Sequence, residues 1–238
     1  MYSSSPESPV LLLGCAHVVN LADPLRRVLA SRVLDGIAVE LDEERAQALM
    51  SPERNERASG SAPLFARVWG VLQRRLGAEI GGDVPGSEMK VAIGVGRERN
   101  LPVFLIDDPL RATLGSLVRQ MSFKERVTLM VSALVGLVLP SRVVVREMDR
   151  YSASPTEYTD ELRRVSPTIA RVLIDDRNEH MADRLASLRQ KGYGRMAVVL
   201  GDAHIDGLRS ALGRRGLPCE VVRFSELRAA TAPSPGSS

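Results

Sequence analysis

The sequence predicts an α/β protein with a mostly parallel central sheet and helices on both faces of that sheet. Short continuous apolar runs recur along the 238 residues, and such runs are typical of strands that are covered on both sides. Segments with helical periodicity separate the runs, and a strand–helix–strand unit favours parallel pairing. A hydrophobic content of 44% is enough to fill the core. The expected strands are residues 10–13, 37–41, 102–106, 196–200 and 219–224.

Capping residues and helical spacing place helices between the strands of the N-terminal half. Apolar residues recur at helical spacing after Asn20, which can cap that helix, and Asp35-Gly36 marks its end. Ser87 is expected to cap a helix that runs to about Arg99. We also expect helices over residues 43–50 and 64–76, a polar insertion over 51–63 and a glycine-rich turn over 77–86.

The C-terminal half is expected to be mostly helical. Pro109 suits the first turn of a helix, and Met121-Ser122 marks a break between two amphipathic or buried helices. Ser166-Pro167 starts a further helical segment. The helices expected here cover residues 110–139 in two pieces, 155–165, the segment after Ser166-Pro167, and 205–213.

Composition indicates how the domain is bounded. The leader, residues 1–9, and the tail, residues 229–238, are rich in Ser and Pro and are expected to be disordered. Between them we expect a single domain over residues 10–228, with a helical insertion at about 110–170.

Charge and cysteine content narrow the functional classes. The net charge is only +3, and the basic residues are scattered among acidic ones, so we expect no nucleic-acid surface. Cys15 and Cys219 cannot make a disulfide framework, which predicts a reducing, cytoplasmic location. The start of the chain is not a secretory signal, and the uncharged run over 127–141 is too short to cross a bilayer, so no integral membrane segment is expected.

The same motif occurs near both ends of the chain. An apolar strand is followed by Gly-x-Ala-His at Gly14 to His17 and again at Gly201 to His204, and the chain has only three histidines. Ligands of parallel α/β proteins bind where the strands end, and imidazole serves both as a metal ligand and as a general base. Either histidine alone would be interpreted as an ordinary loop or buried residue, but the repetition favours chemistry.

Glu40 is the unusual residue of the second expected strand. A carboxylate in an apolar run is costly to bury unless it is paired or binds a metal ion. Its place near the carboxyl end of the strand would bring it close to the His17 loop. The structural alternatives are that Glu40 caps the next helix with Asp42, or that it pairs with an arginine.

Arg177 is predicted to point inward. It shares a helical stripe with Leu173 and Met181, whereas His180 falls on the polar side and is expected to have no special role. A guanidinium on such a stripe needs a carboxylate, a carbonyl or a substrate. A salt bridge to Glu40 or to a neighbouring acid is as compatible with the sequence as a contact to substrate.

Four motifs occur in a fixed order along the chain. They are Gly14-Cys15-Ala16-His17, Val39-Glu40-Leu41-Asp42, Asp176-Arg177-Asn178-Glu179-His180-Met181-Ala182 and Gly201-Asp202-Ala203-His204. In this order they resemble the family of the pheromone-shutdown protein TraB and its relatives, the Tiki metalloproteases and GumN-like proteins. The likeness covers about residues 10–212 and includes the segment around Glu88.

The resemblance implies a compact α/β domain with a divalent-metal-dependent, peptidase-like site. By motif, it implies that His17, Glu40 and His204 are the metal or catalytic groups, with Arg177 and Asn178 as a polar pair. The further supporting positions would be Gly14, Asp42, Glu88 and Gly201.

The sequence departs from that family in two places. Asp107-Asp108-Pro109 stands where TraB-like sequences tend to have Asp-Arg-Asp, so no charge pair can form within this segment. The hydrophobic membrane tail of many relatives has no counterpart in these 238 residues, so a soluble form is expected.

Two functional hypotheses follow. The first is a hydrolase of peptide bonds that uses a Mn, Co or Zn ion, in which Arg177 stabilises the developing oxyanion or holds Glu40 in place. The alternative is a non-catalytic protein that sequesters a peptide or small ligand in the same cleft. A third hypothesis, nucleophilic chemistry at Cys15, lacks an identified base. A peptide or small-molecule partner is expected, and a homodimer is compatible with the sequence.

Overall fold

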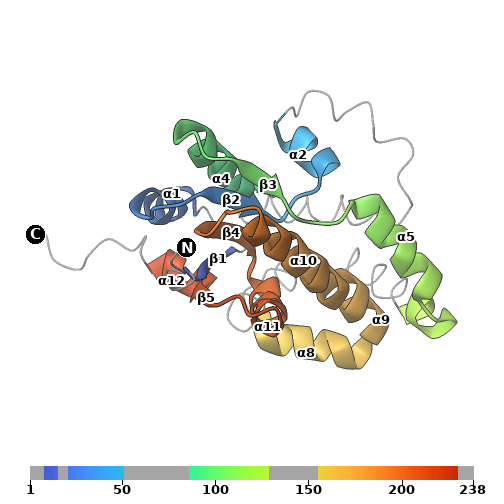
Figure 1. Ribbon diagram of the computed structural model, residues 1–238. Helices are drawn as coiled ribbons and strands as arrows, with labels where there is room; N and C mark the ends of the chain where they lie inside the picture. Colours follow the sequence, from blue (N-terminus) through green and yellow to red (C-terminus); the bar gives the residue numbers. More distant parts are fainter. Residues whose placement is uncertain (1–7, 16–20, 51–85, 129–154, 230–238) are drawn as a thin grey trace, which may run out of the picture.

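A parallel five-stranded sheet forms the centre of the protein (Figure 1). The computed structural model describes residues 8–15, 21–50, 86–128 and 155–229. The sheet has the strand order β3-β2-β4-β1-β5, and every pair in it is parallel. The predicted α/β fold is therefore confirmed. The strands are β1 (Val10–Cys15), β2 (Gly36–Val39), β3 (Val103–Leu105), β4 (Met196–Gly201) and β5 (Cys219–Val222).

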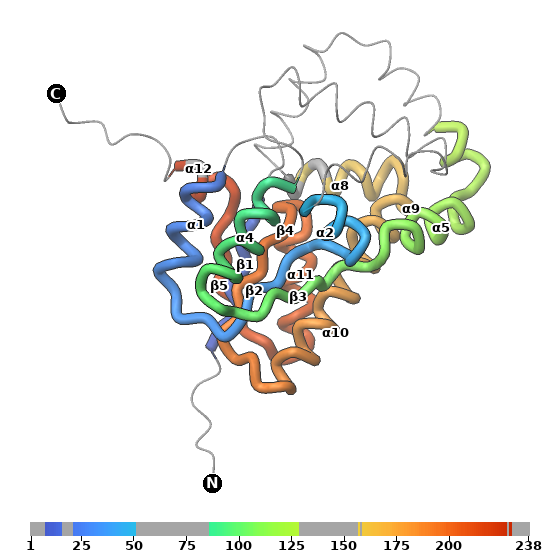
Figure 2. Tube along the Cα trace, turned by 90° about the horizontal axis from the view of Figure 1, so that it is seen from above, coloured from blue at the N-terminus to red at the C-terminus, as the bar shows by residue number. Residues whose placement is uncertain are grey.

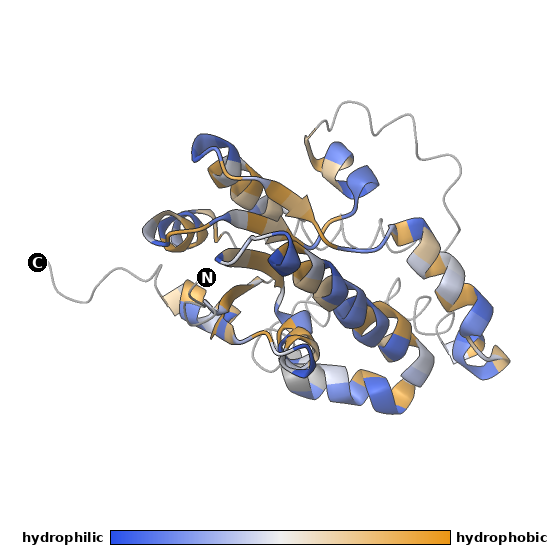
Figure 3. Cartoon of the chain, in the orientation of Figure 1, coloured by the Kyte–Doolittle hydropathy of each residue, from blue (hydrophilic) through white to orange (hydrophobic). Residues whose placement is uncertain are grey.

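Helices cover both faces of the sheet, as the sequence predicts. Leu11 and Leu13 of β1 point to the face covered by α1 (Ala22–Ser31), α4 (Ser87–Glu98) and α12 (Phe224–Ala229). Val10 and Leu12 point to the opposite face, covered by α10 (Asp176–Gln190) and α11 (Ile205–Arg214). The two layers lie on opposite sides of the strands in Figure 2, and Figure 3 shows apolar strands between helices with polar outer surfaces.

The strand register sets the place of the candidate site. Val39 of β2 is paired with Val199 of β4 on one side and with Leu105 of β3 on the other. Cys15 of β1 is paired with Gly201 of β4. The carboxyl ends of these four strands therefore meet along one edge of the sheet.

A second, smaller group of helices packs beside the sheet. α5 (Leu110–Gln120), α8 (Pro155–Val165), α9 (Pro167–Ala170) and η2 (Arg171–Asp175) share a small apolar cluster that includes Leu117 and Ile169. The predicted break at Met121-Ser122 is confirmed, because α5 ends at Gln120 and another helix covers residues 123–128. The insertion over 110–170 as a whole stays a prediction, since residues 129–154 lie outside the described part.

Several local expectations need correction. Gly86, not Ser87, caps α4, because the cap adopts φ 93°, which glycine tolerates without strain. Pro109 is the cap of α5 rather than a first-turn residue. Phe224 begins α12 instead of ending β5. The stretch Arg171–Asp175 is a π-helix, which the periodicity did not predict.

Other expectations fall on parts of the chain that the structure does not describe. The insertion over 51–63, the helix over 64–76 and most of the turn over 77–86 belong to this group. The expected Asn20 cap is wrong, because α1 begins at Ala22 and its cap is Leu21. In the described residues, no helix is both long and apolar enough to span a membrane. The apolar run over 127–141 lies almost wholly outside them. The helix α2 (Glu43–Met50) matches its predicted bounds.

Candidate active site at the carboxyl end of the sheet

Glu40 follows β2 directly and is held through both oxygens of its carboxylate. Its side chain is only 7% exposed. The backbone N–H of Gly201 donates to Oε2 at 2.7 Å, and Arg177 Nη2 donates to Oε1. Ala38 faces the α10 layer, so the alternation of side chains along the strand also turns Glu40 toward α10. Glu40 therefore pairs with an arginine, which was one of the alternatives left open by the sequence.

Arg177 contributes every N–H donor of its guanidinium to contacts within the protein. Nε donates to Asp107 Oδ1 at 2.8 Å, and Nη2 donates to Asp107 Oδ2 at 2.6 Å as well as to Glu40. Nη1 donates to the carbonyl of Leu173 at 3.0 Å and faces His204 Nε2 at 3.2 Å. An arginine side chain has five N–H donors, and these contacts account for all of them. In this arrangement Arg177 holds Glu40 and has no donor left for a substrate oxyanion.

The charge of Arg177 is fixed by its surroundings. Burial alone would lower the pKa of the guanidinium, but the charge of Glu40 and the hydrogen bonds to Asp107 raise that pKa above its ordinary value. Arg177 therefore stays a cation at any pH at which the protein is folded, and it cannot donate a proton to a leaving group.

His204 is buried at the end of a 3-10 turn, η3 (Asp202–His204), that follows β4. Because arginine can only donate, Nε2 must accept from Arg177, and the proton of the neutral ring lies on Nδ1. That N–H donates to Asn178 Oδ1 at 2.9 Å. Nε2 also lies 3.4 Å from Oε1 of the Glu40 carboxylate.

Two glycines make room for the polar groups around His204. A Cβ on Gly207 of α11 would lie 2.1 Å from Asn178 Nδ2, so only glycine allows Asn178 to reach the imidazole. A Cβ on Gly14 of β1 would lie 2.1 Å from Asp202 Oδ1. That oxygen accepts from the backbone N–H of Phe224 at 3.0 Å and so anchors the turn that carries His204.

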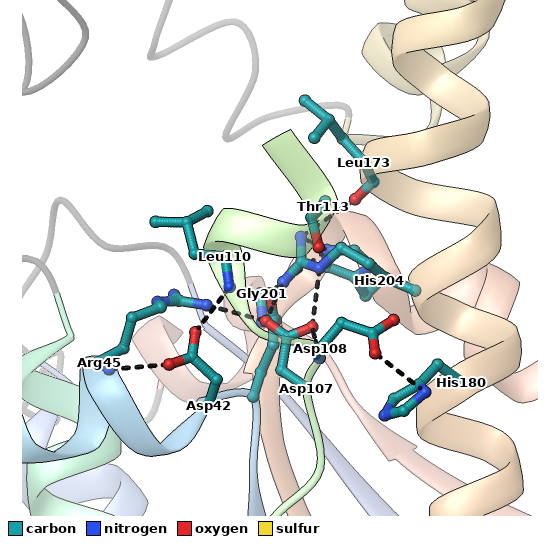
Figure 4. A network of polar contacts seen from close by, with 12 residues as sticks. Asp42, Arg45, Asp107, Asp108, Leu110, Thr113, Leu173, His180, Gly201 and His204 are labelled. Atoms are coloured by element: carbon teal, nitrogen blue, oxygen red, sulfur yellow. Dashed lines mark hydrogen bonds and ion pairs between the residues drawn. The ribbon is translucent and has the colours of Figure 1, made fainter. Parts of the chain in front are cut away.

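Asp107 and Arg45 join the site although the sequence did not assign them to it. The side chain of Asp107, which follows β3, is 2% exposed and also accepts from Arg45 Nη1 at 2.8 Å (Figure 4). Asp107 has no arginine next to it in the sequence, but Arg45 of α2 and Arg177 of α10 supply its cationic partners. A carboxylate at a strand end was the signal that singled out Glu40, and it applies equally to Asp107. Nothing in the sequence marked Arg45.

The comparison with known proteins agrees with the motifs from which this site is built. A model of the TraB/PrgY/gumN family matches residues 3–217. The chain belongs to the TraB/PrgY/gumN family. An uncharacterized protein of the archaeon Methanocaldococcus jannaschii is 30% identical to it over 218 residues. The match covers 87% of this chain and 54% of the archaeal protein, so the chain spans about half the length of that relative.

Of the remaining predicted residues of this TraB/PrgY/gumN protein, the structure places Asp42 beside the Glu40–Arg177 cluster. Asp42 accepts from the backbone N–H groups of Arg45, at 2.9 Å, and Leu110, at 3.2 Å, and therefore caps both α2 and α5. Glu88 is buried in the first turn of α4, in the layer on the other face of the sheet. His17 lies outside the described residues, so its predicted place beside Glu40 stays a prediction.

The remaining polar candidates are His180, which is partly exposed, and Cys15, which is buried. His180 is 30% exposed and pairs with Asp108 at 3.1 Å, as its polar side of the helix predicts. Burial, and then the negative charges of Glu88, Asp202 and Glu40, raise the pKa of the Cys15 thiol well above its ordinary value. Because the thiolate is the nucleophilic form, this environment argues against cysteine chemistry.

Proposed function

We propose that this TraB/PrgY/gumN protein is a metal-dependent hydrolase of peptide bonds, with Glu40 and His204 among the ligands of a Mn, Co or Zn ion. The observation that carries the proposal is the buried pair formed by His204 Nε2 and Glu40 Oε1 at the carboxyl edge of the sheet. Family membership supports it, because the Tiki metalloproteases that the motifs resemble are metal-dependent peptidases.

The spacing of the two donors fits a shared ion. Ligand atoms about 2.0–2.2 Å from a tetrahedral ion are roughly 3.4 Å from each other. His204 Nε2 and Glu40 Oε1 are 3.4 Å apart. Within the described residues, no group of three or more His, Cys, Asp or Glu side chains has a geometry that could hold a metal ion. His17 would have to supply the third donor.

The residues around His204 and Glu40 would orient these two ligands. A bound ion would acidify a water molecule and polarise the scissile carbonyl. Asn178 keeps the proton of His204 on Nδ1 and so leaves Nε2 as the donor atom. Gly201 and Arg177 fix the carboxylate of Glu40. Because Nε2 has one lone pair, the contact from Arg177 Nη1 must open when an ion binds there.

The test combines metal content with peptide cleavage on protein reconstituted with Mn, Co or Zn. The variants are His17→Ala, Glu40→Gln and His204→Ala, and the matched control is His180→Ala, which removes a histidine outside the cluster. We expect stoichiometric metal and metal-dependent cleavage of a peptide library in the parent and the control. Both should be lost in the His204→Ala protein.

Other outcomes would overturn the proposal. Full metal-dependent turnover in the His204→Ala protein would remove His204 from the site. Metal and peptide binding without any product would favour the alternative function, a protein that sequesters a peptide or small ligand.

A further inference from the structure

Arg45 stands at the edge of the same cluster with most of its donors uncommitted. Its side chain is 34% exposed and extends from the first turn of α2. Nη1 donates to Asp107 Oδ2 at 2.8 Å. Among the described residues, the guanidinium of Arg45 makes no other hydrogen bond. No described residue therefore accepts from the Nε–Nη2 edge of this side chain.

The carboxylate next to Arg45, that of Asp107, already pairs with a second cation, Arg177. Asp107 receives two hydrogen bonds from Arg177, through Nε and Nη2, in the paired geometry typical of arginine and a carboxylate. Four side chains of alternating charge are thus linked in series: Glu40, Arg177, Asp107 and Arg45. The last member of this series, Arg45, is the partly exposed cation, and among the described residues its guanidinium contacts one carboxylate, that of Asp107.

The base of the Arg45 side chain is held in place. Its backbone N–H donates to Asp42 Oδ1, and the other oxygen of Asp42 accepts from the backbone N–H of Leu110 on α5. In Figure 4, Arg45 extends from α2 toward Asp107, on the side of the cluster opposite to His180. A ligand would meet a guanidinium whose direction is set in advance, which reduces the entropy lost on binding.

We propose that Arg45 binds a carboxylate group of the substrate at the edge of the Glu40–His204 cluster. The open Nε–Nη2 edge presents two parallel N–H donors, which match the two oxygens of a carboxylate better than they match a single carbonyl oxygen. This assignment rests on the proposed function, since it names the substrate class of the same site: short peptides with a carboxylate near the bond to be cleaved.

The test measures binding, so that it does not depend on turnover. The probes are N-acetyl-Ala-Ala with a free C-terminal carboxylate and the same peptide with a C-terminal amide. Both are titrated calorimetrically into chelator-treated full-length protein, because a bound metal ion would itself attract the carboxylate. Arg45→Gln is compared with Arg111→Gln, which removes the same charge from an exposed pair with Glu44 on α2.

We expect the parent protein and the Arg111→Gln control to bind the carboxylate peptide about tenfold more tightly than the amide. The Arg45→Gln protein should bind both peptides equally weakly. Arg45→Lys keeps the charge without the paired donors, and it should retain only part of the preference. Thermal unfolding of each variant checks that the fold is intact.

The inference is overturned if the parent protein binds the two peptides equally or binds neither, or if Arg45→Gln keeps the preference. A preference that depends on Arg45 without any hydrolysis would sustain this inference and refute the proposed hydrolase. Hydrolysis without such a preference would support the proposed hydrolase and refute the role of Arg45.

Discussion

The two sides of the candidate site use the same pair of residue types in different ways. On the α10 side, the side chain of Arg177 is 15% exposed, and all its N–H donors make hydrogen bonds to neighbouring groups. On the α2 side, Arg45 is 34% exposed and contacts the same acceptor, Asp107, through Nη1 alone. A buried charge must be fully paired to be tolerated, whereas a partly hydrated one can leave donors to water and hence to a ligand.

Replacing Arg177 should have the largest effect. Arg177→Met would leave Glu40 and Asp107 buried without their shared cation, so we expect the free energy of unfolding to fall by about 3–5 kcal/mol. Urea unfolding followed by circular dichroism measures this loss. The control is Arg26→Met, which breaks an exposed pair with Glu98 and should have far less effect. Equal losses in both variants would contradict the view that Arg177 is the central structural cation.

Asp107→Asn should have the second largest effect on the free energy of unfolding, because Asp107 accepts hydrogen bonds from both Arg177 and Arg45. Asn keeps one acceptor oxygen but replaces the other with an NH2 group, which can only donate. Part of the contacts from Arg177 and Arg45 would therefore be lost, at a cost of about 1.5–3 kcal/mol. The control Asp108→Asn affects a half-exposed pair with His180.

A double-variant cycle checks that Asp107 couples the two arginines. The effect of Arg45→Gln on unfolding should be smaller in the Asp107→Asn background than in the parent protein. Strict additivity would mean that Arg45 and Asp107 act independently.

Gly207→Ala tests how the α10 side positions His204. The new methyl group would meet Asn178 Nδ2, so we expect a loss of about 1–3 kcal/mol in the free energy of unfolding. Gly213→Ala, in the same helix, meets no atom within 4 Å and should be neutral or slightly stabilising. Thermal unfolding of the Gly207→Ala and Gly213→Ala proteins measures the difference in stability. A stable Gly207→Ala protein with an unchanged His204 NMR titration would show that the close fit of Asn178 is unimportant.

Arg45→Gln should have the smallest effect on stability. Because Arg45 is partly hydrated and has one described acceptor, we expect a loss of less than about 1 kcal/mol in urea unfolding. The loss should appear in ligand binding instead. A destabilisation as large as that of Arg177→Met would make Arg45 a structural residue and erase the contrast between the two sides.

Parts of the site could be predicted from the sequence because they follow from local pattern. A charged residue inside an apolar strand marked Glu40, and helical spacing marked Arg177 as inward-facing. Asp107 could have been found by the argument used for Glu40, but Arg45 could not, because an arginine in a first helical turn is ordinary. The glycine at 207 became meaningful only when Asn178 was seen to occupy the space beside it.

The sequence by itself determined the five strands, most of the helices that flank them (α12 excepted) and the two copies of Gly-x-Ala-His. Local hydrophobic periodicity encodes these features, so they need no knowledge of distant contacts. The tertiary structure alone decided that β4 lies between β1 and β2, with Gly14 opposite Leu200 rather than opposite Gly201. Strand order and register depend on how residues far apart in the chain pack together. They place Asp107 and Arg45 beside Arg177, a contact that no local pattern contains.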